Sequence, residues 1–323
     1  MRVKRPDKTG FQHVYGPVPS RRLGSSLGID LVPFKTCTYD CIYCQLGRTT
    51  HKTIERKEYV AAEEILSELE RKLADGPVPD YISLVGSGEP TLNVCIGDII
   101  DKIKALTRIP VAVITNGSLL WMPTVRHALM NVDLVLPSLD AGDQPTFQAV
   151  NRPRREIPFD RMVNGLVGFT GWFPGHVWLE VFLLDGITGS LSEVKKIADL
   201  VGRIHPEKVQ LNTVTRPAAE TYASPISRTV LESYVDLFGP NAETITDKSA
   251  TVSLYDGSPT LEDIKGILLR HPCNVEDLAE GLNIQPIVAV KQLEILMNAG
   301  KVKEIIGNGG RFYVLSQKQK HRI

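Results

Sequence analysis

Short apolar runs that alternate with amphipathic stretches are the feature that most restricts the fold of this chain. The runs between about residues 26 and 215 are rich in Val, Ile and Leu, which is typical of strands buried on both faces of a parallel sheet. The predicted strands are Leu27–Val32, Tyr81–Val85, Val111–Thr115, Leu134–Leu139, Trp178–Leu184 and Val209–Thr213. The predicted helices between them include Ala62–Leu73, Ile96–Leu106 and Leu191–Val201. This alternation indicates right-handed βαβ units and predicts an α/β fold, a partial (β/α)6 barrel that is too short for a closed eight-unit barrel.

Charge and hydropathy narrow the class of protein. The chain has 323 residues with 37 Lys and Arg against 37 Asp and Glu, so its formal net charge is zero. A neutral chain has no broad attraction to DNA or to an anionic membrane. No apolar run approaches the roughly 18 residues that a membrane span needs, and the first ten residues lack the apolar stretch of a secretory signal. We therefore expect a cytoplasmic protein without a membrane partner.

The chain outside the βα units has other patterns. We expect an N-terminal arm over 1–25, the barrel over 26–215, a connecting region over 216–257, a winged-helix domain over 258–316 and a basic tail over 317–323. The arm is predicted to be irregular because it is rich in Gly, Pro, Arg and Ser and lacks periodicity. The connecting region is predicted to hold a helix near Val230–Phe238 and a strand near Thr251–Leu254.

The last part of the chain predicts three helices followed by a β-hairpin. The helices are expected at Thr260–Leu269, Val275–Glu280 and Pro286–Asn298, and the hairpin strands at Val302–Ile306 and Arg311–Leu315. Asn274 is a suitable N-cap for the second helix, and Pro286 suits the first turn of the third. This order of elements is typical of a winged helix-turn-helix.

Three of the five cysteines, Cys37, Cys41 and Cys44, fall within one short segment. An odd number of cysteines without an even framework argues against disulfides. The segment follows a predicted strand, and barrel enzymes place their chemistry at the carboxyl ends of strands. Thiolates are soft ligands that suit iron–sulfur clusters or zinc. A [4Fe–4S] cluster normally takes four cysteines, so three would leave one iron with an open position, as a catalytic metal requires.

Two other interpretations of the triplet stay open at this stage. A structural zinc site would need a fourth ligand, and His51 is close enough in sequence to supply it. The three thiols could also be unrelated buried side chains, since cysteine often behaves as a small hydrophobic residue. Cys95 and Cys273 stand alone and are expected to be structural thiols.

The spacing Cys37-x3-Cys41-x2-Cys44, with Tyr43 before the last cysteine, resembles the radical S-adenosylmethionine superfamily. The resemblance implies a [4Fe–4S] cluster whose free iron chelates the amino and carboxylate groups of S-adenosylmethionine. It also implies that the reduced cluster gives one electron to the sulfonium, and that a 5′-deoxyadenosyl radical then takes hydrogen from a substrate. An electron donor such as ferredoxin or flavodoxin is implied as a partner.

Segments after later strands carry the same resemblance. Gly86-Ser87-Gly88-Glu89 resembles the Gly-Gly-Glu motif that holds the methionyl amino group, with Ser87 in place of the first glycine. The ends of the third and fourth strands resemble segments that contact ribose and carboxylate, although Asn116-Gly117 is also a common turn dipeptide. The cofactor-binding residues implied in this way are Tyr43, Gly88, Glu89, Thr115, Asn116 and Ser138.

Two further segments narrow the resemblance. Residues 15–22, Tyr-Gly-Pro-Val-Pro-Ser-Arg-Arg, and residues 138–141, Ser-Leu-Asp-Ala, look most like iron–sulfur oxidoreductases related to the wybutosine-synthesis enzyme of tRNA. This likeness implies a modified RNA base as one class of substrate. Archaeal relatives carry extra N-terminal cysteines for a second cluster, whereas no cysteine precedes Cys37. A single-cluster reaction is therefore expected.

Polar residues left at the predicted strand ends are candidates for substrate contact or catalysis. Glu180 lies among apolar neighbours and is predicted to be a buried carboxylate with a raised pKa. Asn212 and Arg216 follow the sixth strand, and the basic segment 151–155 could grip a phosphate or carboxylate. Each of these residues could instead belong to an ordinary ion-pair network.

The charge of the predicted winged helix is low. Residues 258–323 hold nine Lys and Arg against seven Asp and Glu, which is weak for a phosphate-binding module. Few side chains of its presumed recognition helix could read base edges, so sequence-specific DNA binding is not expected. Loose RNA contact, protein contact and simple packing stay open.

Three functions compete. The favoured hypothesis is a radical S-adenosylmethionine oxidoreductase that acts on a tRNA base or another bulky substrate. The second is an enzyme of the same chemistry that activates a glycyl-radical protein or otherwise modifies a protein. The third is an iron–sulfur redox sensor that regulates genes through its winged helix. The low charge of the presumed recognition helix and the number of motifs at strand ends argue against the third.

Overall fold

An eight-stranded sheet is the centre of the computed structural model, which describes residues 13–245, 260–282, 284–307 and 310–316. In spatial order its strands are β1 (Val14–Ser20), β2 (Gly24–Asp30), β5 (Tyr81–Val85), β6 (Val111–Ile114), β7 (Leu134–Leu136), β8 (His176–Phe182), β9 (Lys208–Asn212) and β10 (Ala242–Thr244). Neighbours from β2 to β10 are parallel, whereas β1 is antiparallel to β2. Since β1 and β10 stand at the two ends of this order, the described strands form an open sheet.

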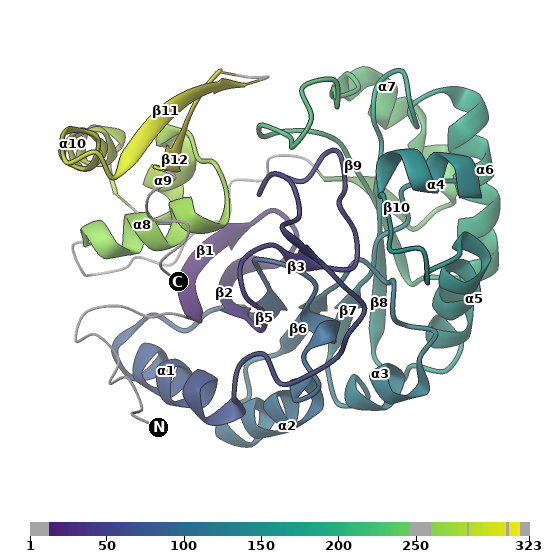
Figure 1. Ribbon diagram of the computed structural model, residues 1–323, viewed down its shortest axis with the longest axis horizontal. Coiled ribbons are helices and arrows are strands. Elements are labelled where there is room, and N and C mark those ends of the chain that lie inside the picture. Colours follow the sequence, from purple (N-terminus) through teal and green to yellow (C-terminus); the bar gives the residue numbers. More distant parts are fainter. Residues whose placement is uncertain (1–12, 246–259, 283, 308–309, 317–323) are drawn as a thin grey trace.

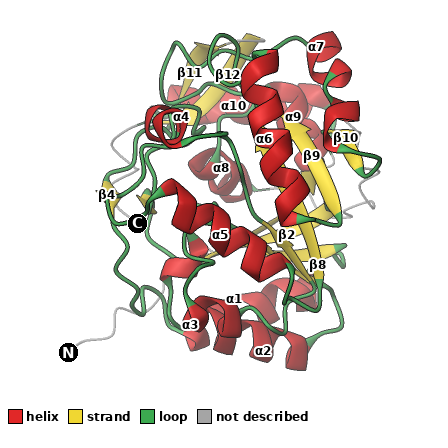
Figure 2. Ribbon diagram, turned by 90° about the vertical axis from the view of Figure 1, so that its right-hand side faces the viewer, coloured by secondary structure: helices red, strands yellow, loops and turns green. Residues whose placement is uncertain are grey.

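Helices alternate with the strands along the chain and cover one side of the sheet (Figures 1 and 2). They are α1 (Ala62–Asp75), α2 (Ile96–Leu106), α3 (Pro123–Ala128), α4 (Gln144–Val150), α5 (Phe159–Thr170) and α6 (Leu191–Ile204). The six predicted strands correspond to β2 and β5–β9, and α1, α2 and α6 begin at the predicted residues. The mixed α/β class with a parallel sheet is confirmed.

The arm is not irregular where the structure describes it, so this expectation is wrong for residues 13–25. Its residues form β1 and the start of β2, which pair as an antiparallel hairpin. The pairing depends on Gly28, because the Tyr15 ring occupies the space that a side chain at Gly28 would fill. Gly28 thus allows two paired strands to approach closely. In the sequence alone, the glycines of this segment instead suggested irregular structure. Residues 1–12 lie outside the described part.

The connecting region differs from the prediction in its second half. The expected helix is present as α7 (Arg228–Ser233) and a 3-10 turn, η2 (Val235–Phe238). A strand that was not predicted, β10, adds to β9 in parallel. The strand expected at Thr251–Leu254 and the basic tail over 317–323 both lie outside the described residues.

The two faces of the sheet differ in character. On the helix-covered face, Leu179, Val181 and Leu211 are fully buried in the main apolar core. The opposite face, called the inner face below, carries a small apolar cluster in which Leu23 joins Leu134 and other residues near the amino ends of the strands. Leu23 is in the turn between β1 and β2. The inner face becomes polar toward the carboxyl ends of the strands, where Glu180 and Asn212 lie.

The C-terminal domain lies beside β1 (Figure 1). Its elements are α8 (Leu261–Arg270), α9 (Val275–Gly281), α10 (Pro286–Asn298), β11 (Val302–Gly307) and β12 (Gly310–Leu315). They follow the order that the sequence predicted, three helices and an antiparallel hairpin. Asn274 caps α9 as expected, in a reciprocal capping box with Asp277, and Thr260 with Asp263 does the same for α8.

Candidate active site

The three clustered cysteines lie on the loop between β2 and α1. Cys37 is the second residue of β3 (Thr36–Cys37), which pairs with β4 (His51–Lys52). A turn follows, in which the Cys44 N–H donates to the Cys41 carbonyl oxygen over 3.2 Å. All three are free and partly exposed. The loop therefore presents three thiols at the carboxyl-end edge of the sheet, as the sequence predicted.

Each of the three sulfurs accepts a hydrogen bond from a different side-chain nitrogen. Lys35 Nζ is 3.1 Å from Cys44 Sγ. Asn116 Nδ2 is 3.5 Å from Cys37 Sγ, and Asn151 Nδ2 is 3.5 Å from Cys41 Sγ. Nitrogen donors around cysteine sulfurs are one way in which proteins tune iron–sulfur clusters. Three thiols surrounded by such donors fit an iron–sulfur cluster.

Burial disfavours the ionised form of two of these thiols, Cys37 and Cys41. Burial, with the Glu89 carboxylate nearby, raises the pKa of Cys37 to about 12. Burial and then Asp140 raise the pKa of Cys41 well above its usual value. Thiolates are the form that binds metal, and a bound metal centre stabilises them against these effects.

Glu89 is an internal anchor. It is 1% exposed, and Oε1 accepts hydrogen bonds from the Thr91 N–H, the Thr91 hydroxyl and the Thr115 hydroxyl at 3.1, 2.5 and 2.6 Å. Oε2 accepts from the Asn116 N–H at 2.8 Å. Burial raises the pKa of Glu89, and these hydrogen bonds oppose the shift. The carboxylate therefore joins the loops after β5 and β6.

Gly88 fits a close approach to the cysteine loop. A Cβ at this position would lie 1.9 Å from the Thr36 carbonyl oxygen. The Glu89 N–H donates to that same oxygen over 3.0 Å. No larger residue could keep this contact, because the backbone itself occupies the space. The sequence-predicted residues Gly88, Glu89, Thr115 and Asn116 are thus brought together with Cys37.

A second polar group surrounds Glu180 on the inner face. Asn212 Nδ2 donates to its Oε1 over 2.7 Å, and Arg22 Nη2 lies 3.1 Å from the same oxygen. The Ser138 hydroxyl is 3.5 Å from Oε2. Arg22 Nη1 is buried and has no hydrogen-bond partner among the residues that the structure describes. Ser138, Glu180 and Asn212 are therefore brought together, and Arg22 is an ion-pair partner that the sequence did not single out as a site residue.

Tyr43 belongs to a third group that links the other two. Its ring stacks on Phe182 with centroids 4.1 Å apart, and its hydroxyl donates to Asp140 over 2.5 Å. Asn151 donates to the same carboxylate oxygen over 2.7 Å and also to Cys41. Burial raises the pKa of Asp140 to about 6. Asp140 thus connects the cysteine loop with β8.

Arg216 is not brought to Glu180. It lies 3.4 Å from Asp277 of the C-terminal domain and 3.5 Å from the Gln45 side chain of the cysteine loop. Most of the basic segment 151–155 is also engaged in ion pairs. Arg152 contacts Glu220 at 2.6 Å, and the other arginines contact Glu156.

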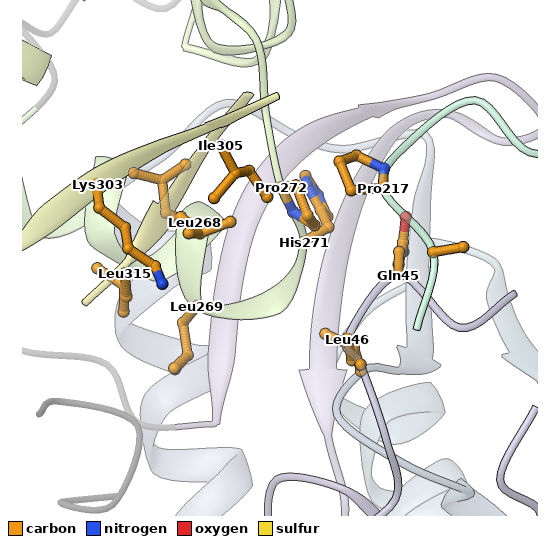
Figure 3. A pocket seen from close by; sticks show the side chains of 13 residues that line it. Gln45, Leu46, Pro217, Leu268, Leu269, His271, Pro272, Lys303, Ile305 and Leu315 are labelled. Carbon is orange, nitrogen blue, oxygen red and sulfur yellow. The ribbon is translucent and has the colours of Figure 1, made fainter. Parts of the chain in front are cut away.

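A cavity of about 210 Å³ separates the cysteine loop from the C-terminal domain (Figure 3). Its walls come from Gln45–Gly47, directly after Cys44, from Pro217 and Ala218, and from the C-terminal domain. Leu268, Ile305 and other apolar side chains form much of the last wall. The cavity thus lies immediately beyond the last cysteine of the loop.

His51, the fourth ligand of the zinc alternative, is exposed and joins the cysteine loop through its backbone. Among the residues that the structure describes, no three His, Cys, Asp or Glu side chains form a site for a single metal ion. The described part of the chain also has no helix long and apolar enough to cross a membrane.

Several site residues escaped sequence analysis because their partners are distant in the chain. Lys35 contacts a sulfur but resembles an ordinary polar loop residue, and Asn151 was singled out only as part of the basic segment 151–155 and not as a contact of a cysteine. Asp140 lies in a segment that the sequence singled out, next to Ser138, and its position directly after a buried strand was the available signal. Arg22 had no such signal, since it reaches Glu180 from the β1–β2 turn.

Comparison with known proteins gives a family match. Residues 31–201 match the radical SAM superfamily. The chain is 41% identical over 316 residues to a GTPase Obg of Brachyspira hyodysenteriae, covering 97% of this chain and 46% of that protein. It therefore spans less than half the length of that relative. It is 32% identical to a UPF0026 protein of Methanocaldococcus jannaschii, covering 95% of this chain and 97% of the relative.

Solved structures share the fold. A radical SAM methyltransferase from Sphaerobacter thermophilus is 17% identical with a TM-score of 0.51, over 68% of this chain and 66% of that one. Streptococcus suis SuiB bound to S-adenosylmethionine is 16% identical with a TM-score of 0.50, over 67% of this chain and 50% of that one. At these identities the likeness shows the fold alone.

Proposed function

We propose that Cys37, Cys41 and Cys44 of this chain hold an iron–sulfur cluster. The chain belongs to the radical SAM superfamily and, within it, to the UPF0026 proteins. Membership makes the protein an enzyme that uses a [4Fe–4S] cluster and S-adenosylmethionine. The observation that carries the ligand assignment is the nitrogen donor beside each sulfur. Three cysteine ligands leave one iron for the amino and carboxylate groups of S-adenosylmethionine.

A cluster and S-adenosylmethionine bound here would supply one-electron chemistry that removes hydrogen from a substrate. The protein contributes position and charge. Lys35 Nζ and the amides of Asn116 and Asn151 hold the sulfurs in place. Glu89 fixes Thr115 and Asn116, which we assign to the cofactor together with Gly88 and Ser138. Tyr43 orients the last turn of the cysteine loop through Asp140.

We assign the substrate side of the site to the inner face. Glu180 and Asn212 present a carboxylate and an amide there, and the buried Nη1 of Arg22 adds a donor that has no partner within the described part of the chain. A donor beside an acceptor suits a planar group that offers both kinds of edge, such as a nucleobase. We therefore propose an RNA base or another bulky substrate, and a single-cluster reaction.

The contacts of Arg216 favour a different role from catalysis. Its guanidinium lies between Asp277 and Gln45, so it ties the C-terminal domain to the cysteine loop. We propose that Arg216 supports the cavity wall beside that loop. This replaces the catalytic role that the sequence suggested for it.

We propose that the sheet is a partial radical SAM barrel and that the C-terminal domain is a winged helix. The continuous parallel order from β2 to β10 and the helix-helix-helix-hairpin order support these two assignments. We also propose a reduced ferredoxin or flavodoxin as electron donor, because the chemistry consumes single electrons. In this arrangement the C-terminal domain would contact substrate or partner and would not read DNA sequence.

The decisive experiment is cleavage of S-adenosylmethionine. We expect the protein, reconstituted without air and reduced with dithionite, to release 5′-deoxyadenosine in proportion to its iron content. Aerobically purified protein, which should lose its cluster, is the matched control. Reconstituted protein with a full cluster and no 5′-deoxyadenosine would refute the proposal.

Mass spectrometry of nucleosides and proteins from cells with and without this protein tests the substrate class. We expect one modified tRNA nucleoside to disappear in the deletion and to return when the wild-type gene is restored. A gene with Cys41→Ala should not restore it. Unchanged tRNA together with loss of a protein modification would favour the protein-modifying alternative.

A further inference from the structure

A buried ion pair joins the C-terminal domain to the sheet. Arg270, the last residue of α8, places Nη2 2.7 Å from Oδ2 of Asp30, the last residue of β2. The two side chains are only 3% and 8% exposed. The guanidinium also lies over the ring of Tyr15, 3.9 Å from its centroid. A pair this deeply buried depends on both partners, because either charge alone would be left without compensation.

The other oxygen of Asp30 holds the turn that contains the Gly-Gly-Glu-like segment. Oδ1 accepts a hydrogen bond from the Ser87 N–H over 2.7 Å. Gly86 has a φ of 120°, and a Cβ there would lie only 1.5 Å from Oδ1. Gly86 and Ser87 therefore pack directly against the Asp30 carboxylate. The conformation of the turn therefore depends on the position of Asp30.

The contacts continue from Ser87 to the cysteine loop. The Ser87 carbonyl oxygen accepts a hydrogen bond from the Lys35 N–H over 2.6 Å. Lys35 in turn donates its Nζ to Cys44 Sγ. A connected path thus runs from α8 through Asp30 and Ser87 to a sulfur.

We propose that Arg270 is a positioning residue for S-adenosylmethionine, which fixes Asp30 and through it the Ser87–Glu89 turn. The inference rests on the proposed function, because it takes that turn to be the segment that meets the methionyl amino group. It makes the C-terminal domain part of the cofactor site. The cofactor's affinity therefore depends on a residue of a domain outside the residues that match the superfamily.

The charge of Arg270 also favours a positioning role for this residue. Burial raises the pKa of Asp30, and the Arg270 guanidinium opposes this shift. Loss of the guanidinium would favour the protonated acid. A neutral acid is a weaker acceptor for the Ser87 N–H than a carboxylate, so the turn would loosen while the cysteines stay in place.

The test measures affinity for S-adenosylmethionine in the full-length reconstituted protein. The readout is the change in the EPR spectrum of the reduced cluster as S-adenosylmethionine is added, with iron and sulfide content measured on the same samples. For Arg270→Met we expect an unchanged cluster content and a Kd at least tenfold higher. Arg270→Lys keeps the charge but loses the planar fork, so we expect a rise of about threefold.

A double variant separates positioning from general loss of stability. In Asp30→Asn with Arg270→Met both charges are gone, and the Asn side-chain oxygen can still accept from the Ser87 N–H. We expect it to recover only part of the affinity that Arg270→Met loses, because an amide oxygen accepts better than a protonated acid but less well than a carboxylate. The control is Lys72→Met, which removes another contact to α8, a 3.6 Å ion pair with Asp263, without touching the Ser87–Glu89 turn. Its affinity should equal that of the wild type.

The outcomes separate the two proposals. Wild-type protein that holds a full cluster but does not respond to S-adenosylmethionine would overturn the proposed function, and this inference with it. A responsive wild type with unchanged affinity in Arg270→Met would overturn the inference alone. If Arg270→Met does not fold, Arg270→Lys and the double variant decide: wild-type affinity in Arg270→Lys would reject the positioning role.

Discussion

Alternate residues of β8 face two environments that differ in almost every physical respect. Leu179 and Val181 point into the apolar core beneath α5 and α6 and are fully buried. Glu180, between them, points to the inner face and contacts Arg22 and Asn212. A shift of one residue along a strand is enough to exchange the faces. The comparison teaches that the same strand supplies core packing on one face and a polar group of the candidate site on the other.

Asp140 and Asp143 repeat this contrast outside the strands. Burial among site residues raises the pKa of Asp140 to about 6. A hydrogen bond from Lys196 on α6, 2.7 Å away, lowers the pKa of Asp143 to about 2. Two carboxylates three residues apart thus have opposite shifts, because one lies inside the site and the other among the outer helices.

The largest loss of activity should come from a cysteine substitution in the candidate site, compared with one on the helix-covered side of the sheet. Cys41→Ala removes one ligand, so we expect loss of the iron–sulfur absorbance and no detectable 5′-deoxyadenosine. Cys95→Ala, at the start of α2 on the helix-covered side, should keep both. Iron analysis and circular dichroism of the two variants check this. A full chromophore in Cys41→Ala would disprove the ligand assignment.

Leu179→Ala tests the helix-covered face. The side chain is fully buried, and a Leu→Ala change at such a site removes about 3 kcal/mol from the free energy of unfolding. Urea unfolding of the variant should show this loss. Cleavage of S-adenosylmethionine per cluster should be unchanged, since the residue does not face the site. Reduced cleavage in folded protein would mean that the two faces are not separable.

Glu180→Gln is the matching test of the inner face. Gln has nearly the same shape and can still accept from Asn212, so we expect the free energy of unfolding to change by less than about 1.5 kcal/mol. Substrate turnover should fall at least tenfold, because the charge that pairs with Arg22 is gone. Cleavage of S-adenosylmethionine without substrate serves as the internal control. Normal turnover would remove Glu180 from the substrate site.

The smallest effect concerns pH and Asp143. Its folded pKa lies below the unfolded value of 3.8, so its contribution is present above about pH 4 and is lost as the pH falls toward 2. The side chain is 34% exposed, so solvent limits the contribution to less than about 1 kcal/mol. Asp143→Asn keeps the N-cap acceptor for Thr146. Between about pH 4 and pH 2 the free energy of unfolding of this variant should fall less than that of the wild type, by less than about 1 kcal/mol. A steeper acid limb would contradict the assignment.

Sequence patterns were sufficient where the physical cause is local. The strands β2 and β5–β9 were predictable because each contains a short run rich in Val, Ile and Leu, and the cysteine triplet because its spacing is contained in one loop. The donors to the sulfurs were not, since Asn116 and Asn151 lie 79 and 110 residues from their cysteines. Such contacts are decided by the packing of whole strands and leave no trace in the local pattern.

Arg216 illustrates the limit from the other side. It follows a strand, as an active-site residue would, yet it extends toward Asp277 in another domain. Position after a strand predicts which edge a residue occupies. It does not predict the direction of a long side chain, because that depends on where oppositely charged groups of distant segments come to lie.

The apolar cluster around Leu23 has a consequence for access. It fills the inner face near the amino ends of the strands. The polar group of Glu180 and Asn212 lies next to it, toward the carboxyl ends. We therefore expect substrate and electron donor to approach from the opposite edge of the sheet, where the three clustered cysteines lie. A bulky substrate bound at that edge would also keep dissolved oxygen away from a cluster held by these cysteines.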